Sequence, residues 1–403
     1  MNSHPFSRFV LAPLLLCLIS MIFFQVLLIG SVSKDFYYID ETLLVVATLL
    51  IFVPLCKESE YVKLVLLIIV SFLVFFGLSY RSFAYRSEVT IVMALLIHFK
   101  FFFFFLLFYN FRRFINPPML VNILFGLTIF GILLNFIMGE AFIHMMGGEV
   151  QHRFNITRPI GFQGSTGNMG FTLAFAFLLY ALRTGRENLK NVITLTLIFV
   201  LLFIFSSVRT PFAALGIVLF LLLGGSLKKI FLGLIMLLPL LLTEYMTELI
   251  AITAENITSI IDPSESGYIR GIMIYFSVIL AGTYFPFGTG AASYGSALSA
   301  NSPVYQELGL STSHFFVEME GIYDSNFATL LGEFGVVGLA LFMYLVWRCC
   351  RLIVVNGGHK KFIYGFIFVI FFYSLVAPVY MASYAAMFSA LILVAAIDSK
   401  KAS

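Results

Sequence analysis

Long apolar runs separated by short polar turns make up most of this chain. A helix needs about 20 mainly apolar residues to cross the hydrocarbon core of a membrane, and twelve runs approach or exceed that length. We therefore predict twelve membrane-spanning helices, at residues 9–29, 39–55, 62–80, 89–111, 119–138, 167–183, 191–207, 210–226, 230–246, 327–347, 362–379 and 381–397. The first run lacks a small-residue cleavage site after it, so we expect it to be retained as a span.

One polar stretch interrupts this pattern, at residues 247–326. Within it, residues 269–285 are apolar enough to suggest a further span. A span there would move the basic residues that follow it to the other side of the membrane, against the usual charge bias. We instead expect a helix that lies along the membrane surface, with Arg270 at its start and Pro286 near its end.

The composition agrees with a membrane protein. Hydrophobic residues make up 61% of the chain and charged residues only 11%, whereas soluble domains carry about 25% charged residues. The net charge of +4 is spread one or two cations at a time between apolar runs, so we expect no binding to nucleic acid. The sequence thus predicts an all-α polytopic membrane protein.

The distribution of basic residues predicts its orientation. With the N-terminus in the cytoplasm, sixteen of the 24 Lys and Arg residues fall in inner loops and seven in outer loops, while Lys100 falls within a span. Because inner loops are enriched in Lys and Arg, we expect both termini in the cytoplasm and one large outer loop between spans 9 and 10. This divides the chain into a bundle (1–246), the outer loop (247–326) and three final spans (327–403).

Three arginines flank membrane entries at the predicted outer face: Arg158, Arg209 and Arg270. Guanidinium groups match the geometry of phosphate oxygens, so together they suggest a clamp for a diphosphate. Each also has a simpler explanation. Arg209 would anchor a tight turn, Arg158 would belong to a glycine-rich loop, and Arg270 would contact lipid phosphate. Arg153 is a weaker candidate of the same kind.

Other polar residues also have two interpretations. Asp324 directly precedes the tenth span, where it would be either the helix N-cap or a general base. His98 and Lys100 lie within the fourth span and suggest a proton or ion path. We favour the alternative that Lys100 extends along a phenylalanine-rich surface towards the membrane edge. The run 101–105, five phenylalanines, is expected to face lipid or to pack between helices.

No metal site is expected. His144, His152 and His314 all fall in predicted outer segments, but none of their spacings is typical of metal ligands.

Four stretches together resemble the O-antigen polymerase and ligase superfamily, bacterial envelope glycosyltransferases that use polyprenyl-diphosphate-linked glycans. In chain order they are RPIGFQGSTGNMGFTLA, SSVRTPFAAL, YIRGIMIYFSVILAGTYFPFGTGAASYG and DSNFATLLGEFGVVGLALF. Their order and the outer loop between the expected spans are similar to those of the family, over about residues 153–342. The resemblance implies a GT-C-like fold in the bacterial inner membrane.

The resemblance also implies a mechanism and a set of site residues. Arg209 and Arg270, helped by Arg158, would bind the diphosphate of a glycan on undecaprenyl diphosphate, and Asp324 would activate the acceptor hydroxyl. The secondary candidates are Arg153, His314 and Glu320. The arginines would supply the positive charge, so no metal or cofactor is expected. The partners implied are the lipid-linked glycan, membrane lipid and a chain-length regulator.

One departure from the family pattern favours the polymerase branch. The last motif ends in the pattern Glu-x-Gly-x-x-Gly, whose first glycine is Gly335. Ligases of this family place a histidine about eleven residues before that glycine, and the position here is Asp324. His314 lies ten residues earlier and is a possible substitute. The sequence therefore predicts polymerisation of repeat units, with two alternatives: ligation of polymer to lipid A–core, and transport of the lipid-linked oligosaccharide.

Overall fold

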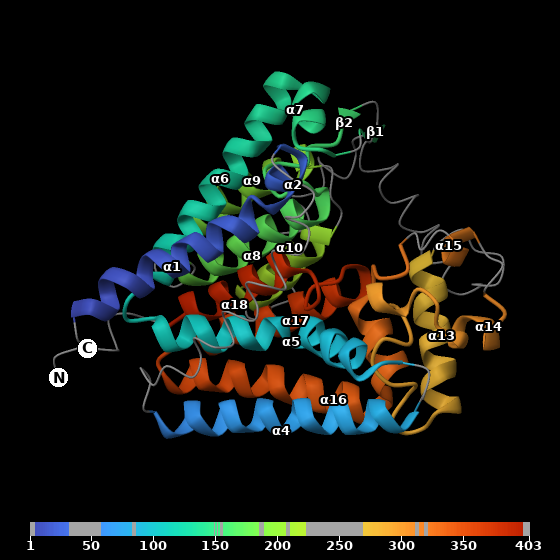
Figure 1. Cartoon of the computed structure of the whole chain (residues 1–403). Helices are drawn as coiled ribbons and strands as arrows, with labels where there is room; N and C mark the ends of the chain where they lie inside the picture. Colours follow the sequence, from blue (N-terminus) through green and yellow to red (C-terminus); the bar gives the residue numbers. More distant parts are fainter. Residues whose placement is uncertain are drawn as a thin grey trace.

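The chain is folded almost entirely into α-helices (Figure 1). The computed structural model describes residues 5–31, 58–82, 86–148, 150, 152–153, 156–184, 189–206, 210–222, 269–310, 314–317 and 321–397. Within these residues, the strands β1 (His152–Arg153) and β2 (Ile156–Thr157) form one short antiparallel hairpin. The predicted spans 39–55 and 230–246 lie outside the described residues.

The predicted apolar runs that fall mainly on described residues coincide with helices. The helices are α1 (Pro5–Phe23), α2 (Gln25–Ser31), α4 (Ser59–Ser82), α5 (Glu88–Phe111), α6 (Pro117–Met138), α7 (Glu140–Met145), α8 (Thr166–Thr184), α9 (Leu189–Ser206), α10 (Thr210–Leu222), α13 (Ile269–Thr283), α14 (Pro303–Glu307), α15 (His314–Val317), α16 (Asn326–Val355), α17 (Lys360–Val376) and α18 (Ser383–Ala395). A 3-10 turn, η2, covers Ala297–Ser299. The first run differs from the prediction, because it is divided into α1 and α2.

Four of the described helices, α4, α5, α6 and α16, are long and apolar enough to cross a membrane. Several apolar helices are shorter, among them α8 and α18. Every residue of α18 is buried, and this helix packs against α5, α6 and α8. The structure thus has the character of a helical membrane protein, and the number of twelve spans remains a prediction.

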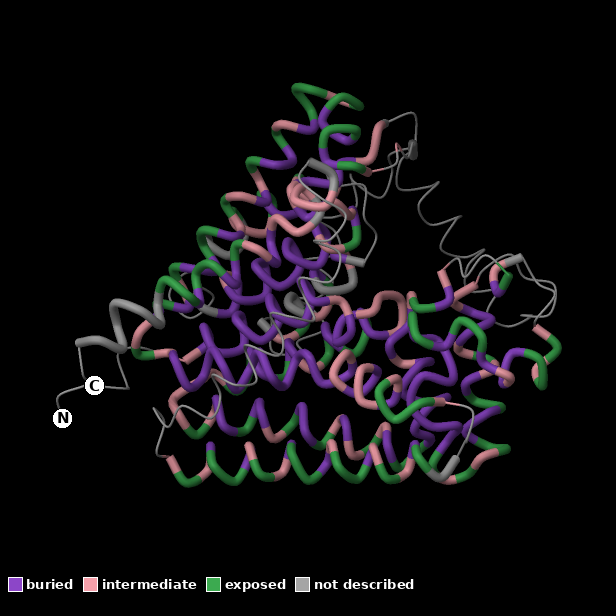
Figure 2. Tube along the Cα trace, in the orientation of Figure 1, coloured by how far each residue is buried: buried purple, intermediate pink, exposed green. Residues whose placement is uncertain are grey.

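The phenylalanine run on α5 packs inside the bundle. All five residues of 101–105 are buried, so the expectation that they pack between helices is confirmed and a lipid-facing role is wrong. Phe101 contacts the ring of Tyr380, with centroids 5.6 Å apart, and Phe102 contacts Phe342 at 4.9 Å. Figure 2 shows α5 buried over most of its length, beyond its first turns.

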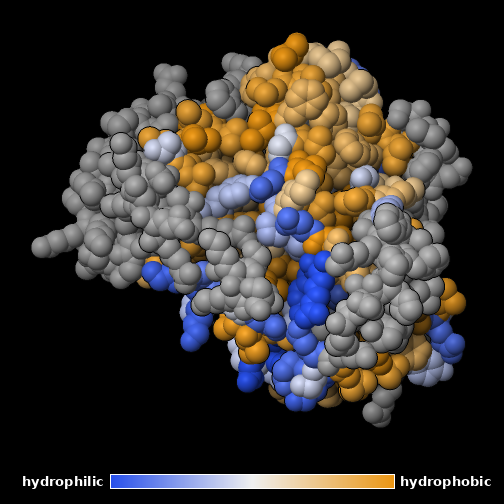
Figure 3. Space-filling view, turned by 90° about the vertical axis from the view of Figure 1, so that its left-hand side faces the viewer, coloured by the Kyte–Doolittle hydropathy of each residue, from blue (hydrophilic) through white to orange (hydrophobic). Residues whose placement is uncertain are grey.

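Polar side chains gather where α4 begins and where α5 and α16 end. Glu58 forms an ion pair with Arg112 and accepts a hydrogen bond from Tyr109 at 2.5 Å. Asn356, just after α16, donates to the same Tyr109 hydroxyl at 2.7 Å. Hydrophilic side chains are visible over the lower part of this end face in Figure 3. We expect this end to face the cytoplasm, as the basic residues predict.

Helix α16 breaks at Gly335, which the sequence did not predict. This glycine has φ 63° and ψ −166°, far from helical values. Residues 326–334 therefore form one helical segment and residues 336–355 another. Figure 1 shows the first segment beside α13 and turned across the direction of the second. The predicted span 327–347 thus falls within α16, which is long and apolar enough to cross a membrane, and its break at Gly335 is an addition to that prediction.

Helix α13 forms nearly where the sequence predicted it. It covers Ile269–Thr283, with Arg270 in its first turn and Pro286 shortly after its end. Its 15 residues rise about 1.5 Å each, too short for the hydrocarbon core of a membrane. In Figure 1, α13 runs across the direction of α4 and α5. This arrangement fits the expected surface helix better than a further span.

Candidate functional site

The loop after α13, residues 286–296, inserts into the break of α16. The break leaves backbone groups of α16 without helical partners, and the loop supplies replacements. The bonds are Thr289 N to Gly332 O (3.0 Å), Gly290 N to Glu333 O (2.6 Å) and Val337 N to Pro286 O (3.3 Å). The third and fourth of the stretches quoted above, which contain the loop and the break, are thereby joined through backbone hydrogen bonds.

Two glycines make this close approach possible. A Cβ on Gly335 would lie 2.4 Å from the Pro286 carbonyl oxygen and 2.6 Å from the Gly288 nitrogen. A Cβ on Gly288 would in turn lie 2.5 Å from the Gly335 nitrogen. Both residues also have positive φ, which side chains disfavour. The loop and the helix break therefore require glycine on both sides of their contact.

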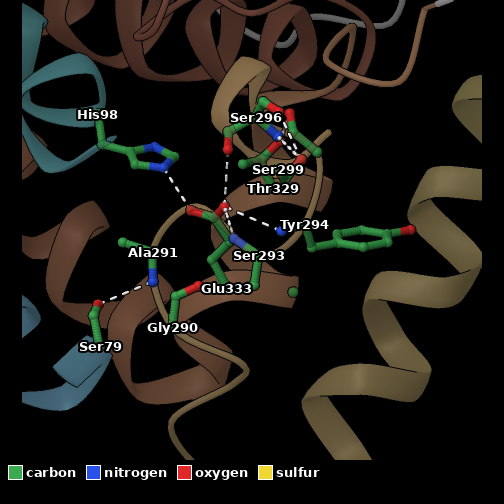
Figure 4. A network of polar contacts seen from close by, with 12 residues as sticks. Ser79, His98, Gly290, Ala291, Ser293, Tyr294, Ser296, Ser299, Thr329 and Glu333 are labelled. Carbon is green, nitrogen blue, oxygen red and sulfur yellow. Dashed lines mark hydrogen bonds and ion pairs between the residues drawn. The ribbon is translucent and has the colours of Figure 1, made fainter. Parts of the chain in front are cut away.

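The carboxylate of Glu333 is buried beneath the second half of this loop (Figure 4). Its Oε1 accepts hydrogen bonds from Ser293 N (2.9 Å), Tyr294 N (3.2 Å) and Ser296 Oγ (3.2 Å). Its Oε2 lies 2.7 Å from His98 Nε2 on α5. A carboxylate is costly to bury without such partners, and here the loop and α5 supply them.

The first half of the loop is held by the segments around α4 and α5. Ala291 N donates to Ser79 Oγ on α4 at 2.9 Å. Arg86, just before α5, donates to the Thr289 carbonyl at 2.9 Å. The loop therefore ties α4 and α5 to the break in α16.

The second half of the loop contacts α13 and α16 near the beginning of each helix. Tyr294 donates through its hydroxyl to the Met273 carbonyl on α13 at 2.8 Å. Thr329 on α16 donates to the Gly295 carbonyl at 2.9 Å. The loop thus fills the space between the two helices whose beginnings carry the predicted site residues.

Arg270 and Asp324 form an ion pair across these two helix beginnings. Arg270 Nη2 lies 2.8 Å from Asp324 Oδ2, and the side chains are 33% and 34% exposed. An ion pair this exposed contributes little to stability. It places a guanidinium group and a carboxylate side by side, each about one-third exposed.

Asp324 is not the N-cap of α16. The cap is Ser325, whose hydroxyl accepts a hydrogen bond from Ala328 N at 3.2 Å. The capping interpretation of Asp324 is therefore wrong, and its carboxylate is directed to Arg270 instead.

Replacing Ser325 by alanine is expected to cost about 1 kcal/mol of stability, because an N-cap hydroxyl is lost. Asp324→Ala should have a smaller effect, since Asp324 makes only a partly exposed ion pair. Thermal unfolding of the two purified variants in detergent checks this ranking. A larger loss of stability for Asp324→Ala would contradict the assignment of the cap.

The turn after α13 is tied to α14. Tyr284 donates through its hydroxyl to Glu307 at 2.6 Å. This hydrogen bond to Glu307 is the largest cause that raises the pKa of Tyr284 to about 12, followed by partial burial. The pKa of Tyr284 is thus raised above its ordinary value of 10.0. The contribution of this hydrogen bond to folding stability is therefore complete below pH 10.0 and is lost as the pH rises towards 12.

The other predicted site residues are placed only in part. Arg158 is half-buried in the segment between β2 and α8. Arg153 belongs to β1, and His314 begins α15. Arg209 and Glu320 lie outside the described residues. Of the predicted residues, the structure thus brings together Arg270 and Asp324.

Lys100 does not reach a membrane edge, so that prediction is wrong. Its side chain is 3% exposed and donates to Ser383 Oγ at the start of α18, at 2.7 Å. His98, in the same helix, is bound to Glu333. Glu333 was not predicted as a site residue, although it stands in the last of the four stretches.

Within the described part of the chain, no three His, Cys, Asp or Glu side chains are grouped so that they could hold a metal ion. Comparisons with models of protein families and with curated proteins found no match.

Proposed function

We propose that this protein is a metal-independent glycosyltransferase that polymerises undecaprenyl-diphosphate-linked repeat units into O-antigen or a related surface polysaccharide. The proposed site lies at the outer face of the bacterial inner membrane. The observation that carries the proposal is the exposed pair of Arg270 and Asp324, at the adjoining ends of α13 and α16. These are the residues to which the resemblance assigns diphosphate binding and acceptor activation.

The pair has the chemistry that this transfer needs. The acceptor hydroxyl attacks the anomeric carbon of the donor, and the bond from that carbon to the diphosphate oxygen breaks. The lipid diphosphate leaves with the electron pair, while Asp324 takes the proton of the hydroxyl. Arg270 stabilises the charge that develops on the leaving diphosphate. A guanidinium group carries five N–H donors, and their planar arrangement matches phosphate oxygens.

The orientation of α13 supports a substrate that arrives from the membrane. A lipid diphosphate is held at the level of the headgroups by its hydrocarbon tail. A short helix that lies across the direction of the spanning helices would hold Arg270 at that level (Figure 1). Arg209 and Arg158 are proposed to complete the clamp from earlier loops.

The acidic residue favours polymerisation over ligation. The ligases place a histidine where this chain has Asp324, and the partner of that position here is an arginine. Transport of the lipid-linked oligosaccharide is the alternative from a different class, and the buried pair of His98 and Glu333 would be its polar element. The three activities differ in their products, which makes them separable.

Purified protein in lipid nanodiscs, given undecaprenyl-diphosphate-linked repeat units, should yield a ladder of longer lipid-linked glycans. A ligase would transfer glycan only when lipid A–core is added, and a transporter would move the substrate across vesicles without lengthening it. In cells, a deletion strain should retain lipopolysaccharide with a single repeat unit. Bare core with accumulated lipid-linked polymer in that strain would overturn polymerisation in favour of ligation.

A further inference from the structure

We propose that Glu333, oriented by His98, is a positioning residue that sets the relative placement of Arg270 and Asp324. It acts through the loop turn formed by residues 293–296. The functional role that this inference gives to the Arg270–Asp324 site rests on the proposed function. The contacts that carry it are structural and can be tested without an activity assay.

The first step is the set of hydrogen bonds by which Glu333 fixes the turn. A single oxygen, Oε1, accepts hydrogen bonds from the Ser293 and Tyr294 amides and from the Ser296 hydroxyl. The Glu333 side chain is fully buried, so water does not replace these bonds. Removal of the carboxylate would leave buried donors without their acceptor, at a cost larger than that of an ordinary hydrogen bond.

The second step leads from the turn to the site. Tyr294 binds the carbonyl of Met273, three residues from Arg270 on α13. Gly295 accepts from Thr329, five residues after Asp324. A Cβ on Gly295 would lie 2.5 Å from Thr329 Oγ1 and 3.1 Å from Met273 Cε, so the turn fits closely between the two helices. A displaced turn would therefore alter the separation of Arg270 and Asp324.

The third step is the role of His98. Its Nε2 lies 2.7 Å from Glu333 Oε2, and its ring packs edge-on against Phe334, with centroids 5.1 Å apart. His98 belongs to α5, the helix that contains the buried run 101–105. The imidazole thereby fixes the second carboxylate oxygen to the centre of the bundle, which leaves Oε1 aimed at the turn (Figure 4).

Loss of the carboxylate should loosen the turn without unfolding the protein. The first half of the loop retains its backbone bonds to Gly332 and Glu333 and its contacts with Ser79 and Arg86. None of these bonds uses the Glu333 side chain. Glutamine at position 333 would keep an oxygen for the three donors and offer an amide to His98, so Glu333→Gln should preserve the turn.

Labelling of a cysteine at Ser299 measures the turn directly. Ser299 is fully buried and bonds to the Ser296 carbonyl and the Tyr305 hydroxyl. In a background with Cys17→Ser and Cys56→Ser, Ser299→Cys should react slowly with a maleimide. Adding Glu333→Ala should raise that rate at least about fivefold, because the turn opens locally. Adding Glu333→Gln should leave the rate near its starting value.

An exposed neighbour supplies the labelling control. Ala300→Cys, at a position exposed in the same turn region, should react at the same rate whether Glu333 is unmodified or carries Glu333→Gln or Glu333→Ala. A Ser299→Cys protein that stays protected when Glu333→Ala is added would overturn the inference. Equal opening with Glu333→Gln and Glu333→Ala would also overturn it, since hydrogen-bond acceptance would then not be the cause.

Kinetics of chain extension give the second test. Glu333→Ala should lower kcat at least about tenfold with KM changed less than about threefold, because misplaced catalytic groups slow the chemical step. Glu333→Gln should restore kcat to within about threefold of the unmodified protein. Glu60→Ala, the same substitution at a glutamate 45% exposed at the beginning of α4, is the matched control and should leave kcat unchanged.

Failure of the proposed function and failure of the positioning role of Glu333 would give different results. Absence of chain extension by the unmodified protein would contradict the proposed function, while the labelling rates would still decide the role of Glu333. Normal kcat for Glu333→Ala in an active protein would overturn the positioning role and leave the proposed function standing.

Discussion

Replacing Gly335 by alanine is expected to prevent the protein from accumulating in folded form. The new Cβ would lie 2.4 Å from the Pro286 oxygen and 2.6 Å from the Gly288 nitrogen, both of which are backbone atoms. The backbone conformation, with φ 63° and ψ −166°, is also one that alanine rarely adopts. Relief of the clash requires the loop to withdraw, and three backbone hydrogen bonds would then be lost. Together these costs reach several kcal/mol, a large part of the roughly 5–15 kcal/mol that stabilises a typical protein.

The measurement is the amount of monodisperse protein extracted from membranes as a fluorescent fusion. Gly77→Ala and Gly126→Ala are matched controls, because both glycines lie within helices and nothing lies within 4 Å of an added Cβ. Both controls should accumulate like the unmodified protein. Normal accumulation of Gly335→Ala would show that the loop and the helix break do not depend on each other.

Replacing Arg270 by alanine is expected to abolish long-chain polysaccharide while the protein remains at its normal level. The substitution removes the guanidinium group that would stabilise the leaving diphosphate and releases Asp324 from its partner. Loss of one such charged donor typically slows transfer by about 100-fold or more. Stability should change little, because the ion pair is one-third exposed.

Lipopolysaccharide banding of a complemented deletion strain checks this result, with protein level measured in the same cells. Arg348→Ala is the matched control, since this arginine lies near the opposite end of α16, beside Glu60. Arg209→Ala should behave like Arg270→Ala. Long-chain polymer in both the Arg209 and Arg270 variants would refute the assignment, and normal chain lengths in Asp324→Asn would remove the general-base role of Asp324.

The sequence predicted the helices well because long apolar runs are a local property. Residues 89–111 and 119–138 were expected as helices, and α5 and α6 match them closely. The division of the first run into α1 and α2 was not predicted. The break at Gly335 was also missed, because it depends on a loop that lies about forty residues earlier in the chain and fits against it.

The site was predicted only in part, because residue type is visible in the sequence and contacts between distant residues are not. Arg270 and Asp324 were identified by residue type and by resemblance, and the structure shows that they touch. The pair of His98 and Glu333 was missed, since its members are 235 positions apart and neither has a local signal of the other. The general rule that a charge within an apolar span needs a partner applies to Lys100 as well, and Ser383 meets that need inside the bundle.

The break in α16 has a consequence for how the site responds to its membrane. Residues 336–355 are about as long as the thickness of a hydrocarbon core, so a tilt of this segment can match a thicker or thinner bilayer. Residues 326–334 are instead fastened to α13 through the loop. A change of tilt would therefore carry Arg270 and Asp324 up or down as one body, with their spacing preserved. Membrane composition would then change the depth of Arg270 and Asp324 in the membrane, where they would meet the proposed lipid diphosphate, while the geometry of the two groups stays the same.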